Sequence, residues 1–123
     1  GDAAQRTATA EEIEVMRGIV KDAVRAGALG FSTTTGTQHN GEGGIPMPSR
    51  LADEAEFRAL TGAVGEAGRG VLMMTKDGTH TVPRFEAWAQ ASGRPFVIAA
   101  LIHSAATPRA VFDDLDAVAE ART

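Results

Sequence analysis

Apolar positions in this chain alternate between helical spacing and short continuous runs. Between Ile13 and Val24 they recur every three or four residues, which is the spacing of one helix face. Thr9 and Glu12 precede them in the order of a capping box, and Gly27 is suited to end a helix. The pattern therefore predicts that the first element is a helix that begins after Thr9.

Three further helices are predicted by their start signals. Asp53, followed by Glu56, has the spacing of a cap, and Pro83 suits the first turn of a helix. Thr107 precedes Pro108 in the same way and is predicted to cap the last helix. The inner face of that helix is expected to carry Val111, Leu115 and Val118.

Short apolar runs near residues 28–33, 70–75 and 95–101 separate these helices. Each is too short for a helix of typical length and is predicted to be a buried strand. Residues 34–52 contain several glycines and prolines and have neither helical nor strand period. A loop of that length inside a compact domain is usually functional or disordered.

The predicted order is a helix followed by three strand-helix units, which indicates an α/β fold with parallel strands and right-handed crossovers. Continuous apolar strands are typical of a sheet that is covered on both faces. Three strands are too few to close a barrel. We therefore expect residues 1–123 to form one partial domain, either three units of a (β/α)8 barrel or part of an open doubly wound sheet. Its exposed sheet edges would pair with the remainder of a barrel or with other copies.

Composition excludes several classes of function. The chain has 123 residues, a net charge of −4 and no cysteine. An acidic chain without a basic cluster is a poor candidate for binding nucleic acid or an anionic membrane. The absence of cysteine removes disulfides and thiolate chemistry. The longest apolar run, residues 96–102, is far shorter than the roughly 20 residues of a membrane span. The start of the chain lacks a signal-peptide pattern, and we expect a cytoplasmic protein.

The three histidines each fall in a loop that follows a predicted strand. His39, His80 and His103 would thus lie at one rim of the sheet, where parallel α/β folds bind ligands. Imidazole is a common zinc ligand, and His80 and His103 are the candidate metal ligands. The spacing favours His103, since it is nearest to a strand end. The alternative is that all three are surface residues in polar loops.

Other polar residues at the same rim are candidates for substrate binding. Ser32 and Thr33 offer hydroxyls, Arg50 could hold an anion, and Lys76 could bind a carboxylate or act as a base. Each has a structural alternative: the hydroxyls could satisfy the loop backbone, Arg50 could brace the long loop, and Lys76 could pair with Asp77. The residues alone identify no catalytic group.

Several segments together resemble one enzyme family. Residues 26–33 (Ala-Gly-Ala-Leu-Gly-Phe-Ser-Thr) and the Pro-Ser-Arg of residues 48–50 are similar to the D-aminoacylase (N-acyl-D-amino-acid deacylase) branch of the amidohydrolase superfamily. The likeness extends over residues 9–16, 68–71 and 93–96, and so covers nearly all of the chain.

This resemblance implies a fold and an activity. Family members are several times longer and combine a metal-dependent (β/α)8 barrel with a small β-sandwich. The chain would match strands four to six, and the parent protein would use a divalent metal, zinc, to hydrolyse the amide bond of N-acyl-D-amino acids or a related small C–N substrate. The histidines that the family carries at the ends of strands five and six are met here by Lys76 and Ala100.

Because those ligands are replaced, the metal site of the parent is expected to be altered, and the chain alone is expected to be inactive. The alternative is a non-catalytic α/β module that binds a small ligand or takes part in assembly.

Overall fold

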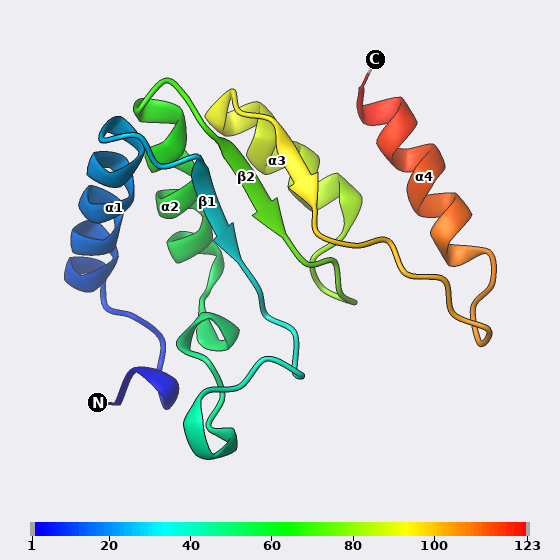
Figure 1. The fold of residues 1–123 in the computed structure, drawn as a ribbon, viewed down its shortest axis with the longest axis horizontal. Coiled ribbons are helices and arrows are strands. Elements are labelled where there is room, and N and C mark those ends of the chain that lie inside the picture. Colours follow the sequence, from blue (N-terminus) through cyan, green and yellow to red (C-terminus); the bar gives the residue numbers. More distant parts are fainter. Residues whose placement is uncertain (1, 123) are drawn as a thin grey trace.

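The computed structural model describes residues 2–122. Four long helices alternate with three short strands (Figure 1). The helices are α1 (Ala10–Arg25), α2 (Glu54–Glu66), α3 (Val82–Ser92) and α4 (Ala110–Ala121), and the strands are β1 (Gly30–Thr33), β2 (Val71–Met74) and β3 (Phe96–Ile98). Single 3-10 turns occur at Asp2–Ala4, Glu42–Gly44 and Pro48–Leu51.

The strands form one open parallel sheet in the order β1-β2-β3. Met73 of β2 lies beside Ser32 of β1 and Val97 of β3. This arrangement confirms the predicted α/β fold with three parallel strands in βα units. The third strand ends at Ile98, earlier than predicted, because β2 ends at its partner Met74.

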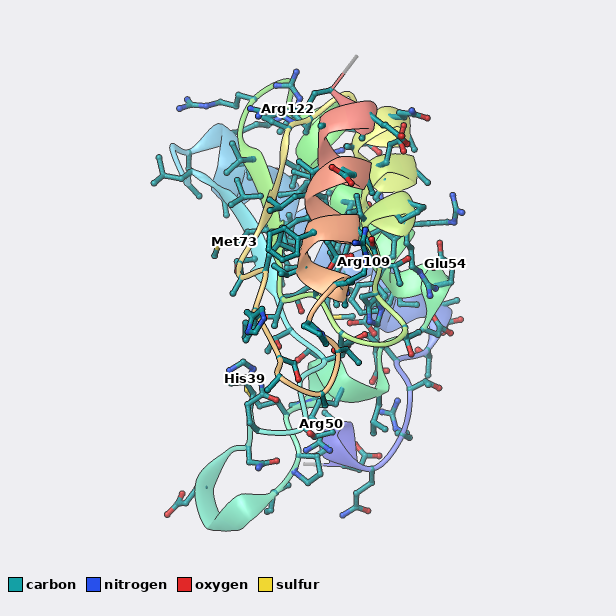
Figure 2. All side chains as sticks on the ribbon, turned by 90° about the vertical axis from the view of Figure 1, so that its right-hand side faces the viewer. His39, Arg50, Glu54, Met73, Arg109 and Arg122 are labelled. Atoms are coloured by element: carbon teal, nitrogen blue, oxygen red, sulfur yellow. The ribbon has the colours of Figure 1, made fainter. Side chains whose placement is uncertain are left out.

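The helices cover only one face of the sheet. Leu72 and Met74 are buried beneath them, whereas Val71 and Met73 alternate with these residues and are exposed. Figure 1 shows α2 and α3 behind the strands with α1 next to α2, and Figure 2 shows α4 on the same side of the sheet as α3, with Met73 on the other. The expectation of a sheet covered on both faces is therefore wrong for residues 2–122. Strands that follow one another in chain order, joined by crossovers of one hand, bring every helix to the same face.

Two buried clusters hold the helices on the sheet. Val24 of α1, Val64 of α2 and Leu72 of β2 form one cluster. The other is aromatic and contains Phe57, Met74, Phe85 and Trp88, against which Phe96 and Ile98 pack. The rings of Phe57 and Trp88 stack at 5.2 Å, and those of Phe85 and Phe96 at 4.5 Å.

The helix starts agree with the predicted signals in three cases out of four. Thr9 and Glu12 form the reciprocal capping box, and the Asp53 carboxylate accepts the backbone N–H of Glu56. Pro83 lies in the first turn of α3. Thr107 does not cap α4, because its carbonyl accepts the backbone N–H of Ala110 in a turn that precedes the helix. That prediction was wrong by two residues, because the residue at the N-cap position is Arg109.

No helix within residues 2–122 has the length and apolar character needed to cross a membrane.

Candidate functional site

The densest polar cluster at the carboxyl ends of the strands consists of Thr35, Asp77 and His80. Thr35 lies just after β1, and the other two belong to the loop between β2 and α3. The Thr35 hydroxyl lies 2.5 Å from Asp77 Oδ2 and 3.1 Å from His80 Nδ1. His80 Nδ1 is in turn 3.1 and 3.2 Å from the two carboxylate oxygens of Asp77. The cluster therefore links the loops that follow neighbouring strands.

Asp77 is held as an ionised carboxylate. Burial alone would raise its pKa, but the hydrogen bonds from the Thr35 hydroxyl and from the backbone N–H groups of His80 and Thr79 outweigh burial, and the pKa is lowered. The two N–H groups donate to Asp77 Oδ1 at 2.7 and 2.8 Å. A carboxylate that accepts several such donors is stabilised in its charged form.

The positions of the partners determine the tautomer of His80. The single hydroxyl proton of Thr35 is donated to the charged Asp77, so the Thr35 oxygen can only accept a bond from His80 Nδ1. When the ring is neutral, its proton is therefore assigned to Nδ1, which leaves the lone pair on Nε2. Among residues 2–122, no buried side-chain nitrogen or oxygen lacks a partner, and His80 Nε2 makes no hydrogen bond there, so solvent reaches this atom.

The imidazole of His80 is otherwise enclosed by the aromatic cluster. The residue is only 6% exposed. Its ring meets Phe57 edge-on with centroids 5.2 Å apart and lies 5.9 Å from the ring of Trp88. Since Phe57 and Trp88 belong to α2 and α3, His80 lies towards the helix layer. The arrangement offers one proton-accepting nitrogen, which is oriented by a carboxylate in the way that histidine ligands and bases commonly are.

The two predicted hydroxyls of β1 do not lie on the same side of the sheet. Ser32 is exposed beside Met73 on the face without helices. Thr33 is half-buried beside Met74 and therefore lies on the helix-covered face. Successive residues of a strand point to opposite faces, so these two hydroxyls cannot contact one small ligand together.

Lys76 and Arg50 have partners within the fold. The Lys76 ammonium lies 3.1 Å from the Asp114 carboxylate of α4. Its ion-pair partner is therefore Asp114 and not Asp77, and the ammonium does not point into an empty cleft. Arg50 donates to the side-chain oxygen of Asn40 at 2.6 Å. This contact fits the alternative in which Arg50 braces the long loop.

The histidines do not converge on a metal site. His39 and Arg50 lie at the same end of the molecule (Figure 2), and His39 Nδ1 is 2.8 Å from the Thr34 hydroxyl. His103 is exposed in the loop after β3. Nowhere in residues 2–122 do three histidine, aspartate or glutamate side chains gather in a way that could hold a metal ion. With Lys76 paired to Asp114 and no ligand atom on Ala100, the residues present do not fit zinc.

Sequence reasoning missed the link from Thr35 to Asp77. The contacts of Asp77 within its own loop do have a local signal, because an aspartate followed by glycine and threonine commonly accepts hydrogen bonds from backbone N–H groups two or three residues ahead. Asp77 accepts such bonds from Thr79 and His80. The contact with Thr35 joins residues 42 positions apart and has no local signature.

Comparison of this chain with family models, with curated proteins and with solved structures finds no match.

Proposed function

We propose that this chain is three consecutive βα units of a (β/α)8 barrel of the amidohydrolase type. The observation that supports this proposal best is the placement of all long helices on one face of a sheet whose strand order follows the chain. A doubly wound sheet reverses its strand order and carries helices on both faces, whereas a barrel keeps them outside. The exposed Val71, Met73 and Val97 on the other face are of the type that fills a barrel interior.

The proposed activity of the assembled barrel is hydrolysis of the amide bond of N-acyl-D-amino acids or a related C–N substrate. The resemblance of residues 26–33 and 48–50 supports it. Arg50 supports it further, because it lies at the carboxyl end of the sheet and donates to a neutral amide oxygen, that of Asn40. A guanidinium has five donors, so Arg50 retains N–H groups for a substrate carboxylate.

This chain would contribute substrate contacts to such a barrel, and not metal ligands. A metal-dependent activity would then depend on ligands from other parts of the barrel, because Lys76 and Ala100 replace the expected histidines. A cytoplasmic location belongs to the same proposal and is supported by the absence of cysteine.

The test is an assay of the longer protein that carries these residues. We expect it to release free amine from N-acetyl-D-amino acids with bound zinc, and Arg50→Ala to raise KM at least about tenfold, the cost of losing a charge-assisted contact. Arg58→Ala, on an exposed site of α2, is the matched control. We expect the 123-residue chain alone to show no turnover, with or without zinc. Turnover by the chain alone that chelators abolish would contradict the proposal.

The second candidate is a non-catalytic α/β module for ligand binding or assembly. The ion pair between Lys76 and Asp114 favours it, because the charged group nearest to the end of β2 is already neutralised. A longer protein that is free of metal and shows no turnover, yet binds N-acetyl-D-amino acids in calorimetry, would support this module over the enzyme.

A further inference from the structure

The one asparagine of this chain, Asn40, lies in the long loop and is followed by a glycine. Residues 40–48 are all exposed. Asparagine is among the thermolabile residues of proteins, because the backbone nitrogen of the next residue can attack its side-chain amide. Glycine at that next position hinders the attack least, since it has no Cβ. The pair of Asn40 and Gly41 therefore has the composition and the exposure of a reactive site.

The side chain of Asn40 is held by a charged donor. Arg50 Nη1 donates to Asn40 Oδ1 at 2.6 Å, whereas Asn40 Nδ2 donates to the carbonyl oxygen of Thr37 at the long distance of 3.4 Å. A donor that is aimed at an oxygen on which negative charge develops stabilises that charge. The guanidinium thus lies where it would stabilise the oxyanion formed by attack on Asn40 Cγ, and the amide nitrogen that must leave is weakly held.

The attacking group is the backbone nitrogen of Gly41. Its N–H donates to the carbonyl oxygen of Ile45 at 2.7 Å, so this bond must open before the attack. The bond closes an exposed turn outside the sheet and the four long helices. Turns of this kind open at a small cost in free energy, because their opening exposes no buried core.

From these contacts we infer that Asn40 is a site of spontaneous deamidation, that Arg50 promotes the reaction, and that the new carboxylate then binds Arg50 as an ion pair. The Gly41 nitrogen loses its proton to hydroxide and forms a bond to Asn40 Cγ, while the bond from Cγ to Nδ2 breaks and ammonia leaves. Water then opens the resulting succinimide to aspartate or isoaspartate. The product replaces a neutral amide by a carboxylate beside a guanidinium, which is the stronger kind of hydrogen-bonded pair.

Asp77 and Gly78 form the one other pair in the sequence in which glycine follows a side chain able to close such a ring. Asp77 accepts several hydrogen bonds that lower its pKa, so it stays a carboxylate at neutral pH. A carboxylate is a much poorer electrophile than an amide whose oxygen is bound by a guanidinium. Residue 77 should therefore remain unchanged and serves as an internal control.

The consequence for substrate binding rests on the proposed function. An Arg50 that is neutralised by a carboxylate at residue 40 would attract a substrate carboxylate less strongly. Deamidation would therefore weaken substrate binding progressively in the assembled barrel. The reaction itself needs no substrate, metal or turnover, so it can be tested on the 123-residue chain.

The chain would be incubated at neutral and at mildly alkaline pH, and its proteolytic peptides would be analysed by mass spectrometry and ion exchange. We expect the peptide with residue 40 to gain one negative charge, faster at the higher pH, and residue 77 to stay unchanged. Gly41→Ala should slow the reaction at least about tenfold by hindering the attack. Its backbone φ of −81° suits alanine, and the new Cβ would lie 3.6 Å from the Ile45 carbonyl oxygen, an ordinary contact.

Variants at two arginines test the role of Arg50. Arg50→Ala should slow deamidation at least about threefold, because the oxyanion loses its charged donor. Arg58→Ala, at an exposed site of α2, is the matched control and should react at the wild-type rate. Circular dichroism would confirm that all variants fold.

The ion pair is tested by the reactivity of Arg50 towards phenylglyoxal, which should fall at least about threefold in Asn40→Asp. No new charge at residue 40, equal reaction at residue 77, an unchanged or faster rate in Arg50→Ala, or equal phenylglyoxal reactivity of Arg50 in both proteins would overturn the inference. These measurements do not bear on the proposed function, which would instead be contradicted by an unchanged KM of Arg50→Ala in the longer protein.

Discussion

At the scale of single residues, Asp77 makes the contacts that set the geometry of the rim. It accepts hydrogen bonds from Thr35, from the ring of His80 and from two backbone N–H groups. Within the cluster of Thr35, Asp77 and His80, Asp77 is the charged side chain that joins the loop after β1 to the loop after β2. The stability of this rim should therefore follow the ionisation of Asp77.

Asp77→Asn is expected to lower the free energy of unfolding by about 1–3 kcal/mol at neutral pH, because the amide replaces an acceptor of charge-assisted bonds. The folded state lowers the pKa of Asp77. The stabilisation should therefore be complete above the ordinary pKa of aspartate, about 4, and decrease as the pH falls below it. Urea unfolding of the wild type and the variant at pH values from about 2 to about 7 would measure this difference in the free energy of unfolding.

Asp116→Asn, at an exposed site of α4, serves as the control and should change the free energy of unfolding by less than about 0.5 kcal/mol. A difference between wild type and Asp77→Asn that stays constant down to the lowest pH would contradict the assigned role of the carboxylate.

The site could be predicted only in part at this scale. The sequence correctly places His39, His80 and His103 in loops after strands, because strand ends can be recognised from apolar runs. It does not reveal that His80 lies against Phe57 and Trp88, since those contacts depend on how two helices pack. The partner of Lys76 was missed for the same reason, because Asp114 lies 38 positions away, on α4.

At the scale of elements, the helix caps differ in what they contribute. Thr9→Ala should destabilise the fold by about 1 kcal/mol, the usual cost of removing an N-cap. Thr107→Ala should change stability by less than about 0.5 kcal/mol, because the Thr107 side chain does not cap α4. Thermal unfolding followed by circular dichroism would compare them, and equal losses from the two variants would contradict the observed start of α4.

Two glycines of α2 offer a sharper comparison. A Cβ at Gly65 would lie 2.4 Å from the carbonyl oxygen of Ser92, so α3 approaches α2 closely there. Gly65→Ala should therefore destabilise the protein by about 1–3 kcal/mol through overpacking. At Gly62 nothing lies within 4 Å, and Gly62→Ala should stabilise by about 0.5–1 kcal/mol through helix propensity. Urea unfolding would measure both, and a neutral Gly65→Ala would show that the two helices are less tightly packed.

The helices were predicted well because their apolar spacing and caps are local signals, as Thr9 with Glu12 illustrates. The end of β3 was predicted less well, because residues 99–101 are as apolar as the strand itself. Pairing, and not composition, ends β3, since β2 offers no partner beyond Met74. The turns at Glu42–Gly44 and Pro48–Leu51 in the long loop likewise have no periodic signal.

At the scale of the whole molecule, the sheet has one covered face and one open face. Apolar runs do not reveal which residues of a strand face solvent, so the sequence suggested two covered faces. On the open face, Met73 is 38% and Val97 46% exposed, and the two lie side by side. The two edge strands, β1 and β3, each pair only with β2 among residues 2–122. Adjacent exposed apolar side chains on a sheet with such edges are typical of a surface that associates.

We therefore expect the isolated chain to associate in solution, with a sedimentation coefficient that rises with concentration. The double substitution Met73→Lys and Val97→Lys should reduce association, because two charges resist burial against another apolar surface. Val15→Lys and Ile19→Lys in α1 add the same charge at exposed apolar sites away from the sheet, where Val15 is 63% exposed, and should leave association unchanged. If net charge alone governed association, the two double variants would behave alike. A wild-type chain that stays monomeric at every concentration would contradict the prediction that the open face of the sheet causes association.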